Sequence, residues 1–318
     1  MDMTRRTAIG AGAAAALLPT ASQAAAPMAT TQAPGFFRFR VGDYQVTAIN
    51  DGVATRPTDG FIPNAPAGAL TELLTQNFLP TDRFVISFTT LVVNTGSKLV
   101  LIDTGNGDMG APTSGTWLAN FRAAGFEPSQ VDTVVISHFH GDHINGLRTK
   151  DGQARFPQAE VKVPAPEWAF WTDDARAAQA PAGLKGTFDN TRRVFGPMAK
   201  DVAQYQWGQE VAPGITAIDA NGHTPGHTAF AITSGTGRLL VMSDTTNNPT
   251  VFARRPEWSA IFDQDGPQAV ATRKRMLDMA ASERMQVSFY HAPFPATGFM
   301  VREGQGYELV PATWQPNV

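Results

Sequence analysis

The sequence predicts an α/β fold in which two similar halves make up one domain. Apolar runs typical of strands, several of them joined by tight turns, recur in both halves, and each half also contains helical segments. The composition, 42% hydrophobic and 17% charged, is that of a folded globular chain. After the first residues no linker or low-complexity segment interrupts the chain, which favours one domain over two.

The first 26 residues are predicted to be a signal peptide rather than part of the fold. Arg5 and Arg6 precede an apolar stretch at residues 8–18, and small residues follow at 24–26. This is the order of a secretory signal, and the paired arginines indicate the twin-arginine route. The apolar stretch is shorter than the roughly 20 residues that a membrane span needs.

We therefore expect export of the protein to the periplasm or the medium. Residues 1–26 form the predicted twin-arginine signal peptide, residues 27–35 a flexible lead-in, and residues 36–318 a single folded domain. No membrane attachment is expected after signal removal, because no other apolar run approaches the length of a span.

Turn and cap signals separate the expected elements of the mature chain. Gly42-Asp43 and residues 95–97 mark hairpin turns, Gly125 marks the end of a helix, and Pro267 the start of another. In chain order the sequence predicts hairpins over 37–52 and 84–105, a helix over 116–124, a buried strand over 131–137, helical patches over 167–178 and 190–202, strands over 215–220, 228–234 and 238–244, a helix over 267–282, and strands over 285–292 and 306–310.

Charge and cysteine content exclude several classes of function. The formal net charge is −3, so no strongly basic surface for nucleic acid is expected. The chain has no cysteine, which excludes disulfides, iron–sulfur clusters, thiolate zinc sites and a cysteine nucleophile. Any metal must be held by His, Asp and Glu.

Half of the six histidines fall in one short segment, S-H-F-H-G-D-H at residues 137–143. The segment follows a buried apolar run, and α/β folds place their sites at such strand ends. Imidazole suits zinc, iron, copper and nickel, and a carboxylate adds an oxygen ligand. A functionless cluster of surface histidines is the alternative, but neighbouring imidazoles repel one another when protonated. The sequence therefore predicts a metal site formed by His138, His140, Asp142 and His143.

Further metal-binding residue types end other predicted strands. His223 and His227 follow one strand in the segment N-G-H-T-P-G-H, Asp244 ends another, and His291 ends a third. A centre assembled from distant parts of the chain at one edge of the sheets would explain this pattern.

Taken together, the motifs HFHGDH, GHTPGHT, SDTT, the late histidine and the earlier LIDTG resemble the metallo-β-lactamase superfamily. The resemblance implies a four-layer αβ/βα sandwich with a two-metal site between the sheets. It implies that the first metal is held by His138, His140 and His223, the second by Asp142, His143 and His291, with Asp244 bridging the two. Asp103 would orient a ligand histidine through its ring nitrogen, and His227 would be a structural residue that bonds the loop.

The flanking segments are most similar to the secreted branch that contains methyl parathion hydrolase. That branch has an aromatic-lined pocket, and Trp171 and Phe188 match two of its aromatics, although both could equally be core residues. Residues 106–114 depart from the branch because they lack the bulky aromatic of the organophosphate-degrading member. This departure argues against efficient phosphotriester turnover.

The resemblance implies a hydrolase in which a metal-bridging hydroxide attacks the substrate, with Asp142 and Asp244 as catalytic residues. We expect two divalent metal ions, zinc by default, although iron and manganese accept the same donors. The expected substrates are small uncharged or apolar lactones or aryl esters, with phosphotriester hydrolysis as side activity. A methyl parathion-type organophosphate hydrolase is the alternative, ahead of a β-lactamase, a non-haem iron oxygenase or a metal-binding protein without activity. The resembled branch makes a homodimer the expected assembly.

Overall fold

The computed structural model describes residues 26–318, of which Pro34–Val318 form one compact unit. The predicted signal peptide falls on residues 1–26, and all of these but the last lie outside the described residues. Residues 27–35, the predicted lead-in, contain no helix or strand. Among the described residues, no helix combines the length and the apolar character that crossing a membrane requires.

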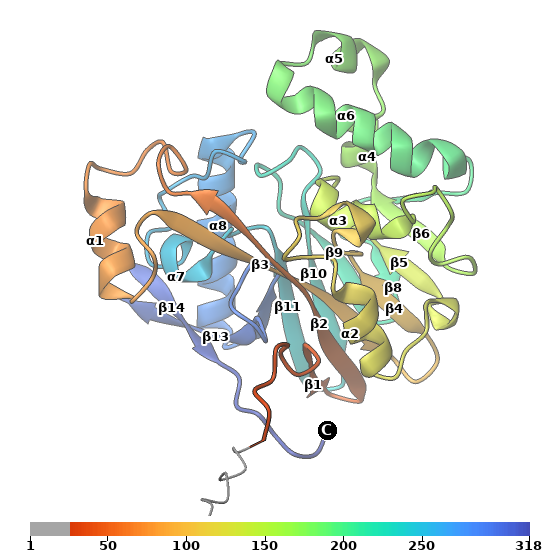
Figure 1. The fold of residues 1–318 in the computed structure, drawn as a ribbon, viewed down its shortest axis with the longest axis horizontal. Helices are drawn as coiled ribbons and strands as arrows, with labels where there is room; N and C mark the ends of the chain where they lie inside the picture. Colours follow the sequence, from red (N-terminus) through yellow and green to blue (C-terminus); the bar gives the residue numbers. More distant parts are fainter. Residues whose placement is uncertain (1–25) are drawn as a thin grey trace, which may run out of the picture. The chain divides into compact units, whose positions relative to one another are not determined.

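Two seven-stranded sheets form the centre of the compact unit, and each is built from one half of the chain (Figure 1). The strands of each sheet are neighbours in chain order. The first sheet contains β1 (Phe36–Val41), β2 (Tyr44–Pro57), β3 (Arg83–Asn94), β4 (Leu99–Ile102), β5 (Thr133–Val135), β6 (Glu160–Pro164) and β7 (Ala203–Tyr205). The second contains β8 (Glu210–Ala212), β9 (Ile215–Asp219), β10 (Thr228–Ser234), β11 (Gly237–Ser243), β12 (Gln286–Phe289), β13 (Thr297–Glu303) and β14 (Gly306–Pro311).

The predicted hairpins are confirmed. β1 and β2 pair antiparallel with Val41 opposite Tyr44, so Gly42 and Asp43 form a two-residue turn in which Gly42 takes a φ of 58°. The pairs β3–β4 and β10–β11 are antiparallel as well. Parallel pairing begins where helices intervene, at β4–β5 and at β11–β12.

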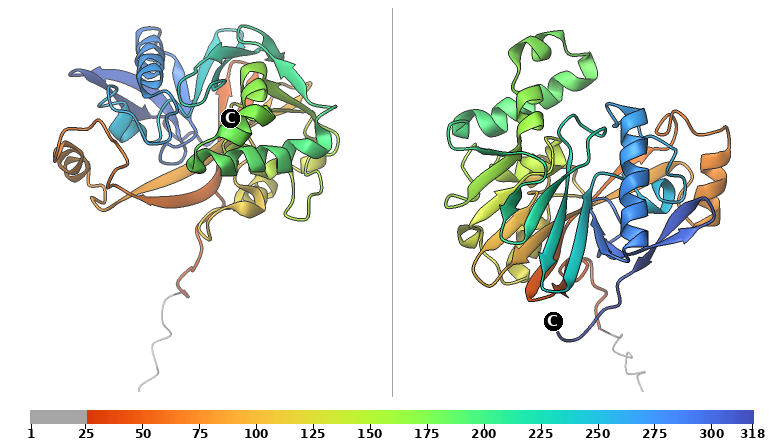
Figure 2. Two further views of the ribbon diagram at one scale, coloured as in Figure 1. Left: turned by 90° about the horizontal axis from the view of Figure 1, so that it is seen from above. Right: turned by 180° about the vertical axis from the view of Figure 1, so that it is seen from behind.

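Helices cover the outer faces of the two sheets. Above the first sheet, α2 and α6 share a hydrophobic core with strands β4 to β6, and α8 packs in the same way on the second sheet (Figure 2). The helices are α1 (Ala69–Gln76), α2 (Trp117–Ala123), α3 (Gly141–Ile144), α4 (Ala165–Trp171), α5 (Asp174–Gln179), α6 (Ala182–Phe195), α7 (Pro249–Phe252) and α8 (Gly266–Ser282).

A third core lies between the two sheets and shows why the strands are apolar on both faces. In β11, Leu239 and Val241 belong to this inner core, whereas Leu240 and Met242 belong to the core under α8. Successive side chains of a strand point to opposite faces, so both sets are buried. The order of layers is therefore helices, sheet, sheet, helix, which confirms the predicted αβ/βα sandwich.

The structure corrects several expected elements. The predicted helical patch at 167–178 is two helices, because the side chain of Asp173 accepts hydrogen bonds from the backbone N–H groups of Ala175 and Arg176 and starts α5. The patch at 190–202 starts earlier, at Ala182, and gives way to a 3₁₀ turn at Gly196–Met198. The sequence did not predict α1 or the strands β6, β7, β8 and β13. Of these strands, β6, β7 and β8 are only three to five residues long.

Candidate metal centre

Seven predicted ligand side chains meet at one edge of the sandwich. The loop after β5, together with α3, carries four of them, and the loop after β9 and the ends of β11 and β12 carry one each. These are the carboxyl ends of four strands, as the sequence predicts. The residues are His138, His140, Asp142, His143, His223, Asp244 and His291.

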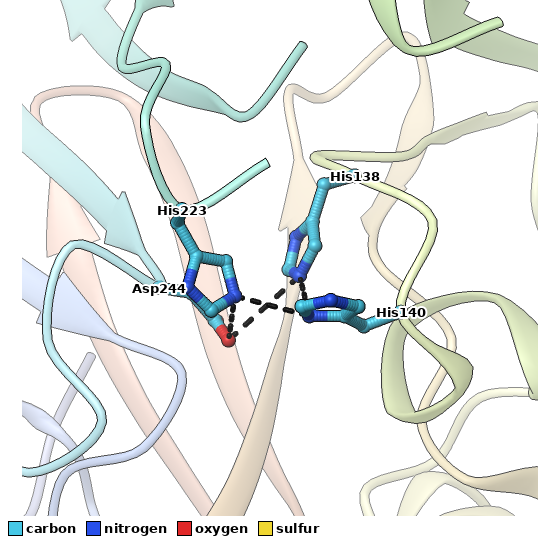
Figure 3. A group of neighbouring side chains, drawn as sticks. All are labelled: His138, His140, His223 and Asp244. Atoms are coloured by element: carbon cyan, nitrogen blue, oxygen red, sulfur yellow. Dashed lines mark hydrogen bonds and ion pairs between the residues drawn. The ribbon is translucent and has the colours of Figure 1, made fainter. Parts of the chain in front are cut away.

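The first group consists of His138, His140, His223 and Asp244, which point toward one another in Figure 3. One ligand atom from each lies within 4.8 Å of the others. Nδ1 of His140 lies 3.0 Å from Nε2 of His138 and 3.0 Å from Nε2 of His223. Oδ2 of Asp244 lies 3.4 Å from Nε2 of His223. Three imidazoles and one carboxylate therefore enclose one point.

The second group consists of Asp142, His143, Asp244 and His291, also within 4.8 Å. Nε2 of His143 lies 3.2 Å from Oδ1 of Asp244 and 3.5 Å from Oδ2 of Asp142. Nε2 of His291 lies 2.9 Å from Oδ2 of Asp244. Asp244 thus contributes to both groups, because Oδ2 faces His223 and His291 and Oδ1 faces His143.

The donor set fits two divalent cations. Nε2 of His143 and Oδ1 of Asp244 are buried and have no hydrogen-bond partner among the described residues. Leaving such a buried group unsatisfied costs about 1–3 kcal/mol, and a cation would remove that cost. Imidazole nitrogen and carboxylate oxygen are donors that zinc, iron and manganese all accept.

Burial controls the charge of the first group. It lowers the pKa of His138 well below its ordinary value, with the neighbouring His143 acting in the same direction. It also lowers the pKa of His140 to about 3, and His223 adds to the effect. Both imidazoles are therefore neutral at pH 7, which is the form that binds metal.

Carboxylates control the charge of the second group. Burial acts to lower the pKa of His143, but Asp244, Asp142 and Asp103 outweigh it and raise the pKa well above the ordinary value. The pKa of His291 is raised in the same way, against burial, by Asp244 and Asp142. Burial acts to raise the pKa of Asp142, but His143 and His291 hold it at about 2. Without a bound cation, the carboxylates of this group are held in the ionised form, and its two imidazoles keep their protons to a higher pH than an ordinary histidine does.

Asp103 and His227 lie where the sequence places them, beside the ligands. Oδ2 of Asp103 accepts a hydrogen bond of 2.8 Å from Nδ1 of His143, and its Oδ1 accepts one from the backbone N–H of Ser137. Nδ1 of His227 donates to the carbonyl of Ala220, and Nε2 accepts from the backbone N–H of Asp244 at 3.0 Å. His227 belongs to neither ligand group and holds the backbone of Asp244 in place.

Sequence reasoning missed two charged side chains behind the first group. Oδ1 of Asp263 lies 2.9 Å from Nδ1 of His223, and Nη2 of the buried Arg273 donates to Oδ2 of Asp263 at 3.3 Å. Nε of Arg273 also donates to the carbonyl of Thr245, next to Asp244. Asp263 lies in a loop and Arg273 in the middle of α8, and no motif marks either of them.

Two further missed residues contact the ligand loops. The hydroxyl of Tyr290 donates to the carbonyl of Asp142, and its ring packs on His143 with centroids 3.9 Å apart. Glu167 in α4 is buried and accepts hydrogen bonds from the backbone on both sides of the first group. In the sequence Glu167 is an ordinary acidic residue in the first turn of a helix.

Trp171 and Phe188 lie in the hydrophobic core rather than on an open surface. Their side chains are 0% and 2% exposed, their ring centroids are 4.7 Å apart, and both belong to the core above the first sheet. Nε1 of Trp171 donates to Oε1 of Glu167 at 2.8 Å. The structure thus corrects the expected pocket placement in favour of the core alternative, because neither ring leaves surface for a substrate.

The sequence model of the metallo-beta-lactamase superfamily matches residues 82–287 of this chain. The matched residues include six of the seven candidate ligands. Curated relatives are probable metallo-hydrolases of Mycobacterium bovis and Mycobacterium tuberculosis, each 26% identical over 183 residues. These matches cover 48% of this chain and 55% of each relative, so the chain spans about half the length of those relatives.

Solved structures resemble the chain over most of its length. The hydrolase AbOPH of the beta-lactamase superfamily is 30% identical, with a TM-score of 0.84 over 90% of this chain and 100% of that one. AidC, a dizinc quorum-quenching lactonase solved with a product, is 26% identical, with a TM-score of 0.83 over 88% of this chain and 98% of that one. A probable metal-dependent hydrolase from Staphylococcus aureus is 19% identical, with a TM-score of 0.72 over 88% of this chain and 100% of that one. At this identity the similarity concerns the fold alone.

Proposed function

Because the chain belongs to the metallo-beta-lactamase superfamily, we propose that it is a two-metal hydrolase of lactones or aryl esters. The observation that carries the proposal is the pair of ligand groups that share Asp244. His138, His140 and His223 would hold one cation, Asp142, His143 and His291 the other, and Asp244 would contact both. When bound, two divalent cations supply a water of lowered pKa and polarise the carbonyl oxygen that is attacked.

Exposure indicates the side from which the substrate enters. The side chain of Asp142 is 22% exposed, whereas those of His143, His291 and Asp244 are at most 3% exposed. His140 is also only partly buried. The substrate would therefore approach over His140 and Asp142, and the other ligands would form the floor of the site.

Asp142 is the residue placed to accept a proton during the reaction. Its pKa of about 2 keeps the carboxylate ionised at neutral pH, and its side chain, 22% exposed, is the most accessible of the second group. A carboxylate in that place can take the proton of the attacking water, whereas the buried Asp244 has no free approach from solvent. Asp244, which belongs to both ligand groups, would hold the two groups in fixed positions relative to each other.

The lactone or ester class is supported by the similarity to AidC, a dizinc lactonase. Phosphotriester hydrolysis of the methyl parathion type is the second candidate, supported by the similar segments that flank the ligand motifs. Residues 106–114, which carry no bulky aromatic, favour the first candidate.

The comparison of two kcat/KM values tests the proposal. The zinc-loaded enzyme is assayed with an aromatic lactone and with a dimethyl aryl phosphotriester, and Asp244→Ala provides the background. We expect a lactone preference of at least about 100-fold, which corresponds to roughly 2.7 kcal/mol in the barrier. The opposite preference would make the phosphotriesterase the main activity, and no turnover of either would remove the proposal.

We also propose that residues 1–26 direct export by the twin-arginine route. The change of both Arg5 and Arg6 to Lys, made in the full chain, should keep the protein in the cytoplasm, whereas the unchanged chain should be recovered outside it in shortened form. Cell fractionation with mass spectrometry of the recovered protein measures both. Equal distribution of the two proteins would contradict this proposal.

A further inference from the structure

Glu167 is a buried acid with no cationic partner among the described residues. Its side chain is 0% exposed, and no Lys, Arg or His of the described chain forms an ion pair with it. A carboxyl group in such a place is costly unless hydrogen bonds satisfy its oxygens. The hydrogen bonds that Glu167 accepts therefore show which parts of the chain it holds together.

Four donors reach the two oxygens of Glu167. Oε1 accepts from the backbone N–H of Phe139 at 2.9 Å and from Nε1 of Trp171 at 2.8 Å. Oε2 accepts from Oγ1 of Thr224 at 2.9 Å and from the backbone N–H of Gly226 at 2.7 Å. Each oxygen thus serves a different loop.

The two loops carry the three histidines of the first group and follow strands of different sheets. Phe139 lies between His138 and His140, after β5 of the first sheet. Thr224 follows His223 directly, after β9 of the second sheet. One carboxylate therefore connects all three histidines of the first group through their neighbours in the chain.

The contact between Glu167 and the second loop is close. A Cβ atom on Gly226 would lie 2.2 Å from the backbone nitrogen of Glu167 and 2.6 Å from its Cβ. Glycine at 226 is thus required for α4 to approach the loop, and the hydrogen bond from its N–H depends on that approach.

The second ligand group has other supports. His143 is held by Asp103, Asp142 by the hydroxyl of Tyr290, and His291 by the carbonyl of Ser87. None of the hydrogen bonds of Glu167 comes from Asp142, His143 or His291 or from a residue next to one of them in the chain. Loss of Glu167 should therefore act on one group and spare the other.

We propose that Glu167 is a positioning residue that joins the loop of His138 and His140 to the loop of His223 and so sets the metal affinity of the first group. The inference rests on the proposed two-metal centre, because it assigns one support to one of its two sites. It requires no contact between Glu167 and substrate or metal.

The variant Glu167→Gln tests this with little change in shape. Its amide presents an oxygen to one pair of donors and an NH₂ group to the other pair. Whichever way the amide turns, one loop loses its acceptor and meets a second donor instead. The effect is measured as zinc affinity of initially metal-free protein, by competition with a chromophoric chelator.

Two backgrounds separate the sites. His291→Ala leaves the first group intact and damages the second, and His223→Ala does the reverse. We expect Glu167→Gln to weaken zinc binding by at least about tenfold in the His291→Ala protein and by less than about twofold in the His223→Ala protein. The exposed Glu72→Gln is the matched control and should change neither affinity.

An equal fall of zinc affinity in both backgrounds would mean that Glu167 only stabilises the fold. Unchanged affinities would mean that Glu167 does not position the ligands. Either result overturns the inference.

Thr224→Val removes one donor and keeps the shape of the side chain. It should give a smaller loss of zinc affinity in the His291→Ala background, and it covers the case in which Glu167→Gln does not fold. Because zinc affinity is read without substrate, the result is distinguishable from a failure of the proposed hydrolysis. A chain that binds zinc selectively but hydrolyses no ester would keep this inference and lose the proposed function.

Discussion

The two ligand groups share one aspartate and differ in almost everything else. The first contains three imidazoles, and burial keeps at least His138 and His140 neutral. The second contains two carboxylates, which raise the pKa values of His143 and His291. The first is thus prepared to bind a cation as it stands, whereas the second must release protons when it does so. Two sites a few ångströms apart can therefore have different affinities and different responses to pH.

The largest expected effect comes from the residue that the groups share. Asp244→Ala should lower kcat/KM by at least about 1,000-fold, since it disturbs both sites at once. His140→Ala, in the first group, should also abolish turnover while the fold survives. Metal content by mass spectrometry should fall below two ions per chain for Asp244→Ala, with Asp174→Ala, an exposed aspartate, as control. Full activity in metal-replete Asp244→Ala protein would exclude a two-metal mechanism.

A smaller and selective effect is expected from the carboxylates behind the ligands. Asp263→Asn should weaken zinc binding at the first group alone, by about 10- to 100-fold. Asp103→Asn should weaken it by a similar factor at the second group and by less at the first, which Asp103 reaches through Ser137. The reason is that Asp263 orients His223, whereas Asp103 orients His143. Chelator competition in the two single-site backgrounds measures both. If each variant weakened both sites equally, the two groups would not be independently supported.

The pH dependence should separate the groups further. His143 and His291 have raised pKa values, so they bind protons at a higher pH than an ordinary histidine does, and these protons compete with the cation as pH falls. Zinc affinity of the second group should fall by up to about tenfold per pH unit for each displaced proton between pH 8 and pH 6. The lowered pKa of His140, about 3, predicts a flatter profile for the first group. Titration of both single-site proteins at three pH values provides the measurement, and identical slopes would contradict it.

The smallest effect is expected from Trp171→Phe. It removes one hydrogen bond to Glu167 from a fully buried ring, so the free energy of unfolding should fall by about 1 kcal/mol. KM should stay within about twofold, because the ring touches no substrate. Urea unfolding and steady-state kinetics measure the two quantities. A large change in KM with unchanged stability would restore the pocket role that the sequence suggested.

The ligands could be predicted from sequence, whereas most of their supports could not. Four ligands lie within residues 138–143, and the others end or closely follow apolar strands, so pattern and order identify them. Glu167, Asp263 and Arg273 are single residues whose partners among the ligands and their loops lie 28 to 59 positions away. Their roles follow from packing between layers, which the sequence does not display.

The secondary structure, too, was predictable only where local sequence signals determine it. The hairpins and α8 were predictable because turn residues and caps are local signals. The division between α4 and α5 depends on one capping side chain, and β13 contains Gly298 within a mostly exposed strand. Short strands such as β7 are defined by their neighbour in the sheet more than by their own residues.

The sharing of ligands between the sheets has a consequence for durability. His138, His140, Asp142 and His143 follow a strand of the first sheet, and the other ligands follow strands of the second. Metal ions bound there would connect the two halves of the chain. Each ion would stabilise the native state by RT ln(1 + [M]/Kd), where [M] is the free metal concentration. Resistance to proteases would then rise with the free metal concentration of the surroundings, and a chelator would shorten the lifetime of the protein even where no substrate is present.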